Sequence, residues 1–67
     1  MAPIKRTATR LKQLRTEREM SQRELAEKAG ISREYLTRLE AARQDPTLST
    51  LEKLAKALKV PVEELLK

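Results

Sequence analysis

The side chains between residues 21 and 47 that could do chemistry are charged and hydrogen-bonding groups. Arginine can bind the O6 and N7 edge of guanine with two parallel hydrogen bonds, and glutamate can accept a hydrogen bond from the N4 amine of cytosine. Polar side chains and free amides at helix ends suit phosphate oxygens. These side chains are therefore suited to recognising a polyanion by hydrogen bonds and charge rather than to catalysis.

The sequence lacks the residues that most enzymes and metal sites require. Its 67 residues include no Cys and no His, so a disulfide framework, a thiolate zinc site and the commonest metal ligand are all missing. No credible pair of nucleophile and base is present, and so short a chain builds a core too small to enclose a pocket. We therefore expect no enzyme activity, no metal, no cofactor and no small-molecule ligand.

The charge balance favours an anionic partner. Fifteen Lys and Arg residues against ten Asp and Glu residues give a net charge of +5, which suits nucleic acid or an anionic membrane surface. The excess lies in residues 1–20, whereas the remainder is nearly balanced. The apolar runs fall far short of the roughly 20 residues that cross a bilayer, and no apolar stretch follows the basic start as in a secretory signal. We expect a soluble cytoplasmic protein with no membrane partner.

Helices joined by short connections are predicted for the first half of the chain. Apolar residues at helical spacing predict a helix over residues 6–18, preceded by a basic arm at residues 1–5. Ser21 followed by Glu24 has the spacing of a capping box, which begins a second helix. That helix is predicted to end at Gly30, because glycine adopts the left-handed cap conformation without strain.

Three more helices are predicted downstream. Ser32 caps a third helix that ends near Ala41, and Thr47 caps a fourth that ends near Lys59. Pro61 is expected in the first turn of a short last helix, where its missing N–H leaves no bond unmade. The sequence thus predicts an all-α, compact five-helix bundle, with residues 6–67 as one domain.

Two capped helices joined at Gly30 match the requirements of a helix-turn-helix, in which the first helix fixes the angle of the second. This spacing also occurs in other compact helical bundles. An advance of about 100° per residue puts Leu36 and Leu39 on the inner side of the third helix. Glu34, Thr37 and Arg38 then face outward, as a reading face requires.

Four stretches of the sequence resemble the Cro/C1-type (XRE-type) helix-turn-helix DNA-binding domains. They are SQRELAEKAGISR at 21–33, YLTRLE at 35–40, DPTLSTL at 45–51 and LAKAL at 54–58. The resemblance covers about residues 8–66 and implies a fold like the DNA-binding domains of phage repressors and the controller proteins of restriction systems. It implies a helix-turn-helix formed by helices 2 and 3, and double-stranded DNA as the partner of the third helix, about residues 32–41. The expected function is that of a transcriptional regulator, associated with the nucleoid when bound, or of a small DNA-binding scaffold derived from one.

Site residues follow from this interpretation and from the face of the third helix. The expected base contacts are Arg33, Glu34, Thr37 and Arg38, with guanine expected for the arginines and cytosine for the glutamate. The expected backbone or flanking contacts are Arg10, Ser21, Gln22, Ser32, Tyr35, Arg43 and Thr47, with Arg6 within reach of the backbone. For Tyr35, partial packing against the second helix is an equal alternative.

The resemblance also implies a structural ion pair between Arg15 of the first helix and Glu40 at the end of the third. The sequence departs from the family at three helix ends, where Gly is common but Glu19, Ala42 and Lys59 stand here. Each such residue costs on the order of 1 kcal/mol in a left-handed cap. Replacement of glycine by helix formers is also typical of stabilising redesign, so an engineered origin stays open.

Two alternatives to a sequence-specific DNA reader stay open. A protein-interaction or antitoxin-like subunit of the same fold would present an apolar face on the third helix, and a nonspecific basic binder would not distinguish DNA sequences. Oligomeric state is also open. Val62, Leu65 and Leu66 would suit a small contact in a homodimer, formed in solution or only on DNA, but the same residues would equally complete the core of a monomer.

Overall fold

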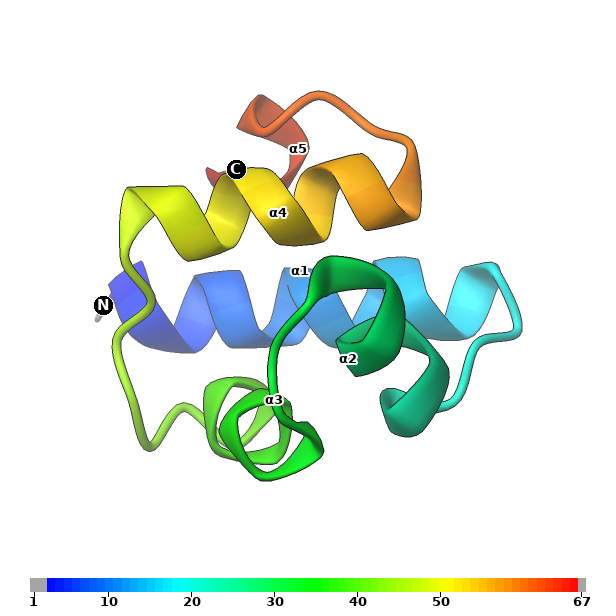
Figure 1. Ribbon diagram of the computed structural model, residues 1–67. Helices are drawn as coiled ribbons and strands as arrows, with labels where there is room; N and C mark the ends of the chain where they lie inside the picture. Colours follow the sequence, from blue (N-terminus) through cyan, green and yellow to red (C-terminus); the bar gives the residue numbers. More distant parts are fainter. Residues whose placement is uncertain (1–2, 67) are drawn as a thin grey trace.

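The structure, a computed structural model, describes residues 3–66, and within that range it contains five helices and no strand (Figure 1). The helices are α1 (Pro3–Glu17), α2 (Gln22–Ala29), α3 (Arg33–Glu40), α4 (Leu48–Leu58) and α5 (Glu63–Leu66). The predicted all-α, five-helix fold is therefore confirmed, and α2 and α3 form the helix-turn-helix.

Leucines from all five helices meet in one core. The fully buried side chains are Leu11, Leu25, Leu36, Leu54, Leu58 and Leu65, each contributing about 1.5–3 kcal/mol by burial. α2 packs against α3 and α4, while α1 contacts α3 and α5. Figure 1 shows α4 and α1 as the middle of the bundle, with α5 on one side and the α2–α3 pair on the other. The helix-turn-helix is therefore supported from behind by two long helices.

The three predicted N-caps are confirmed by hydrogen bonds. Ser21 Oγ accepts from the Glu24 amide at 3.0 Å, and Glu24 Oε1 accepts from the Ser21 amide at 2.9 Å, which completes the capping box. Ser32 Oγ accepts from the amide of Tyr35 at 3.0 Å. Thr47 caps α4 in the same way. These caps satisfy amides at the start of each helix that have no partner within the helix.

Among residues 3–66, four adopt the left-handed conformation at helix ends. Gly30 has φ of 75° after α2, whereas Glu19, Ala42 and Lys59 have φ of 55°, 58° and 60°. The helices without glycine thus end with the geometry that glycine would favour, despite a cost of about 1–2 kcal/mol for each non-glycine residue. The loop after α3 therefore begins with a left-handed residue, Ala42, at the place where the family often has glycine.

Two helix boundaries differ from the prediction. α1 begins at Pro3, so residues 3–5 are helical rather than part of an arm, while Met1 and Ala2 lie outside the described residues. Proline suits the first helical position because its fixed φ is already helical and its N–H is not needed there. α5 begins at Glu63, so Pro61 precedes the helix, and its carbonyl accepts from the Glu64 amide at 3.0 Å.

Within residues 3–66, no helix combines the length and apolar character needed to cross a bilayer. The same residues contain no group of three or more carboxylate, imidazole or thiol side chains placed to hold a metal ion.

Candidate nucleic-acid interface

The outward face of α3 carries the four expected reading residues, all exposed: Arg33, Glu34, Thr37 and Arg38. On the opposite side of the helix, Leu36 is 0% exposed and Leu39 is 2% exposed, which fixes the rotation of α3 about its axis. A shallow hollow of about 300 Å³ runs along this face and is lined by the first three of these residues. The structure thus brings the predicted base-contacting residues together on one polar surface.

Arg38 and Thr37 already have hydrogen-bond partners. Arg38 Nε donates to Gln44 Oε1 at 2.8 Å, a contact with the loop after α3 that the sequence did not predict. The Thr37 hydroxyl lies 3.0 Å from two acceptors, Gln22 Oε1 and the Arg33 carbonyl oxygen. The reading face is therefore partly held in place by residues around it.

A buried network joins α1, α2 and α3. Arg15 Nε and Nη2 donate to the two carboxylate oxygens of Glu40 at 2.7 and 3.1 Å, and the exposed fractions of the two side chains are 12% and 3%. Gln22 Nε2 donates to Glu40 Oε1 at 3.0 Å, and Arg15 Nη1 donates to the carbonyl of Met20 at 2.7 Å. The ion pair that the resemblance implied is present. Gln22 joins the pair by a hydrogen bond to Glu40.

A cationic hollow of about 460 Å³ opens at the N-terminus of α2, lined by Arg15, Ser21, Gln22, Arg23 and Arg33. Arg23 is exposed and was not among the predicted site residues, although its place two residues after the Ser21 cap was a usable signal. Helix amides and arginines favour anions at such a position. The hollow therefore has the charge and donors to accept a phosphate.

Tyr35 reaches α4 through its hydroxyl group and packs against the shared core. Its hydroxyl lies 3.3 Å from Thr50 Oγ1, and the ring is half-buried against the core. Thr47 Oγ1 donates to the same Thr50 oxygen at 3.0 Å and accepts from the Thr50 amide at 3.1 Å. Tyr35, Thr47 and Thr50 thus form one polar cluster at the start of α4, and Ser32 caps α3 through the Tyr35 amide.

Arg10, which was predicted to contact the DNA backbone, bonds to Glu64 of α5. Its Nη2 lies 2.6 Å from Glu64 Oε1, and its Nε donates to the Glu64 carbonyl at 3.0 Å. These bonds link α1 to α5, two helices that pack against each other. Arg6 and Arg43 are exposed, and within the part of the chain described neither guanidinium has a hydrogen-bond or ion-pair partner.

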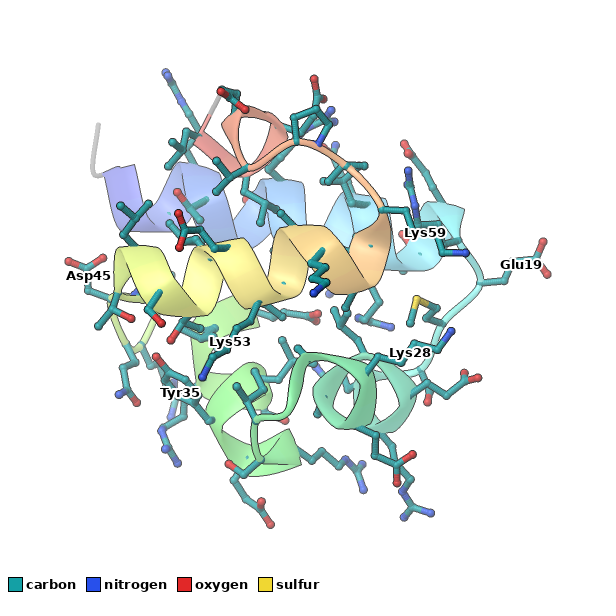
Figure 2. All side chains as sticks on the ribbon, turned by 45° about the horizontal axis from the view of Figure 1, so that its top comes forward. Glu19, Lys28, Tyr35, Asp45, Lys53 and Lys59 are labelled. Carbon is teal, nitrogen blue, oxygen red and sulfur yellow. The ribbon has the colours of Figure 1, made fainter. Side chains whose placement is uncertain are left out.

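A second basic surface lies away from α3. A hollow of about 370 Å³ between α2 and α4 is lined by Lys28, Lys53, Lys56 and Lys59 over a floor of Ala29 and Ala57. Figure 2 shows Lys28, Lys53 and Lys59 along this α2 and α4 side. It carries no arginine and no amide side chain, in contrast to the surface of α3.

Comparison with known sequences gives consistent matches. A family model described as "Helix-turn-helix" matches residues 11–65. The immunity repressor protein of Bacillus phage phi105 is 48% identical over 56 residues, covering 84% of this chain and 39% of that protein. The HTH-type transcriptional regulator SinR of Bacillus subtilis is 45% identical over 58 residues, covering 85% and 52%. The chain thus spans about half or less of the length of these two relatives.

Solved structures match the whole fold. The restriction-modification controller protein C.AhdI from Aeromonas hydrophila superposes with a TM-score of 0.93 at 34% identity, over 97% of this chain and 98% of that one. The biofilm regulator SinR in complex with DNA gives a TM-score of 0.87 at 42% identity, over 91% and 98%.

Proposed function

Because the chain belongs to the Cro/C1-type helix-turn-helix family, we propose that it binds double-stranded DNA sequence-specifically through α3 and regulates transcription. The observation that carries the proposal is the exposed, polar outward face of α3, set beside the cationic hollow at the start of α2. A major groove admits a helix, and its base edges distinguish all four base pairs. A module that binds protein through α3 would favour an apolar face instead.

Four residues of α3 carry the proposed base reading. Arg38 and Arg33 each suit a guanine, and each good bidentate contact discriminates by about 1–3 kcal/mol. Glu34 repels phosphates yet can accept from cytosine N4, which favours base reading over general attraction. Thr37, between them on the same face, is placed for a further base contact.

The proposed phosphate contacts flank α3 on both sides. Gln22, Ser21 and Arg23 surround the hollow at the start of α2, where the helix N-terminus favours anions. On the far side, Arg43 is exposed and unpaired among residues 3–66, and Thr47 stands at the start of α4. Such contacts set the register of the protein on the duplex without reading sequence.

A homodimer on DNA is a further part of the proposal. Leu65 is 0% exposed and belongs to the core, whereas Leu66 on α5 is 53% exposed and is the residue of this pair available for a small symmetric contact between two copies. Two copies would read half-sites about one helical turn apart. Sedimentation with and without duplex distinguishes a dimer in solution, a dimer formed on DNA, and a monomer.

Selection from random duplexes, followed by sequencing of the bound sites, tests sequence-specific binding. A shuffled duplex then competes with the selected one, and equal binding to both would refute base reading. Arg38→Ala is expected to relax preference at one or two base pairs, whereas Gln22→Ala weakens binding to all sequences alike. Lys28→Ala, on the second basic surface, removes the same charge as Arg38→Ala and is expected to leave preference unchanged.

A further inference from the structure

The loop after α3 holds the side chain of Arg38. Gln44 Oε1 accepts from Arg38 Nε at 2.8 Å, and both side chains lie on the exposed surface. Gln44 belongs to neither helix of the helix-turn-helix. The side chain best suited to guanine recognition is therefore held by a residue outside the motif.

The end of α3 brings Gln44 back to Arg38. The Arg43 amide donates to the Arg38 carbonyl at 2.9 Å, and the Ala42 amide donates to the Leu39 carbonyl at 3.1 Å. Ala42 lies between these bonds with φ of 58°, the left-handed turn that reverses the chain at a helix end. Arg38 is thus bound twice by the same loop, through its backbone carbonyl and through its side chain.

The bond to Gln44 determines which edge of the Arg38 guanidinium is free to bind a base. Arginine can bind guanine side-on, through Nε and one Nη, or end-on, through both Nη atoms. Because Nε–H is occupied, the two Nη groups are left to face O6 and N7 of a base. The bond also restrains the long side chain from turning toward a phosphate.

We propose that Gln44 is a specificity-determining positioning residue, which presents Arg38 end-on to one guanine. The inference rests on the proposed binding of DNA through α3. Restraining one side chain of this length before binding is worth roughly a 3- to 10-fold gain at the base that it reads. Gln44 therefore contributes to discrimination without reading that base itself.

The test compares Gln44→Ala and Gln44→Glu on the selected duplex and on duplexes altered at single positions, by fluorescence anisotropy. Gln44→Ala is expected to lose roughly 3- to 10-fold discrimination at the base pair that Arg38→Ala relaxes, and at no other. Gln44→Glu keeps the acceptor, so discrimination persists while the added negative charge weakens binding to all duplexes alike. In the double variant Arg38→Ala/Gln44→Ala, the second change is expected to add no further loss at that base pair.

A second readout needs no DNA. The Nε–H proton of Arg38 in ¹⁵N NMR is expected to exchange with water faster in Gln44→Ala than in the wild type or Gln44→Glu, with the helical circular dichroism unchanged. Unchanged discrimination in Gln44→Ala, or an equal loss on every duplex, would overturn the inference while the proposed function stands. A wild-type protein that binds all duplexes equally would overturn both.

Discussion

Replacement of Glu40 by alanine is expected to destabilise the protein strongly, because it breaks the ion pair with Arg15 from one side. The Glu40 side chain is 3% exposed, and its carboxylate accepts three hydrogen bonds, two from Arg15 and one from Gln22. Its removal leaves the guanidinium of Arg15, a side chain that is 12% exposed, without its counter-charge. Breaking such a buried pair from one side costs about 3–5 kcal/mol.

The size of the effect follows from the surroundings of Arg15. The bond from Arg15 Nη1 to the Met20 carbonyl survives in the variant, and the slight exposure of Arg15 admits some water. We therefore expect a cost near the lower bound, about 3 kcal/mol. For a domain of this size, that cost lowers Tm by roughly 12–24 °C, out of a total stability of about 3–10 kcal/mol.

Urea unfolding followed by circular dichroism measures the cost, with Glu34→Ala as the matched control. Glu34 is an exposed carboxylate on the same helix, so its loss is expected to change stability by less than about 0.5 kcal/mol. The double variant Arg15→Met/Glu40→Met removes both charges and is expected to recover most of the loss, because packed apolar residues replace buried pairs well. A Glu40→Ala cost below about 1 kcal/mol, typical of exposed pairs, would refute the reasoning, as would a double variant no more stable than Glu40→Ala.

Four further predictions concern the caps, the helix ends and the charge of the interface. Ala42→Gly relieves the left-handed strain at φ of 58° and is expected to stabilise the protein by about 0.5–1 kcal/mol, whereas a lower Tm would contradict this account. Gly30→Ala has the opposite effect, a loss of about 1 kcal/mol of stability, although no heavy atom beyond Gly30 and its two chain neighbours lies within 4 Å of the added methyl group. Ser21→Ala removes the capping box and is expected to cost about 1 kcal/mol in thermal unfolding. If about five phosphates are neutralised, the logarithm of the affinity falls with the logarithm of the salt concentration at a slope of −4 to −5. Arg43→Ala is expected to reduce the size of that slope by about 1, whereas the control Lys28→Ala leaves it unchanged. An affinity that does not depend on salt would exclude contact with the DNA backbone.

The parts of the fold that were predictable from the sequence are those set by local interactions. Ser21, Ser32 and Thr47 begin helices because their side chains reach amides three residues ahead, and Gly30 ends α2 because of its own φ. The start of α1 was predicted three residues late, because the apolar pattern begins only at Ala8 and no capping residue marks the true start.

Contacts between distant residues were not predictable from such patterns. Arg10 lies 54 residues from Glu64 in the sequence, and Tyr35 lies 15 residues from Thr50. Helical periodicity gives the face on which a side chain lies, but not which neighbouring helix meets that face. The pair of Arg15 and Glu40 was expected only through family resemblance, and the role of Gln44 depends on a loop whose course neither periodicity nor composition gives.

The network around Glu40 limits how this domain can be re-engineered. Transplanting α3 alone into a related scaffold would bring Thr37 and Glu40 without the amide of Gln22 that bonds to both of them, and without the Arg15 counter-charge on α1. The smallest portable unit is therefore discontinuous in the chain: it consists of α3, two side chains that precede it, and the loop that follows it. A graft confined to α3 would transfer the proposed base-contacting side chains without the residues that hold them in position.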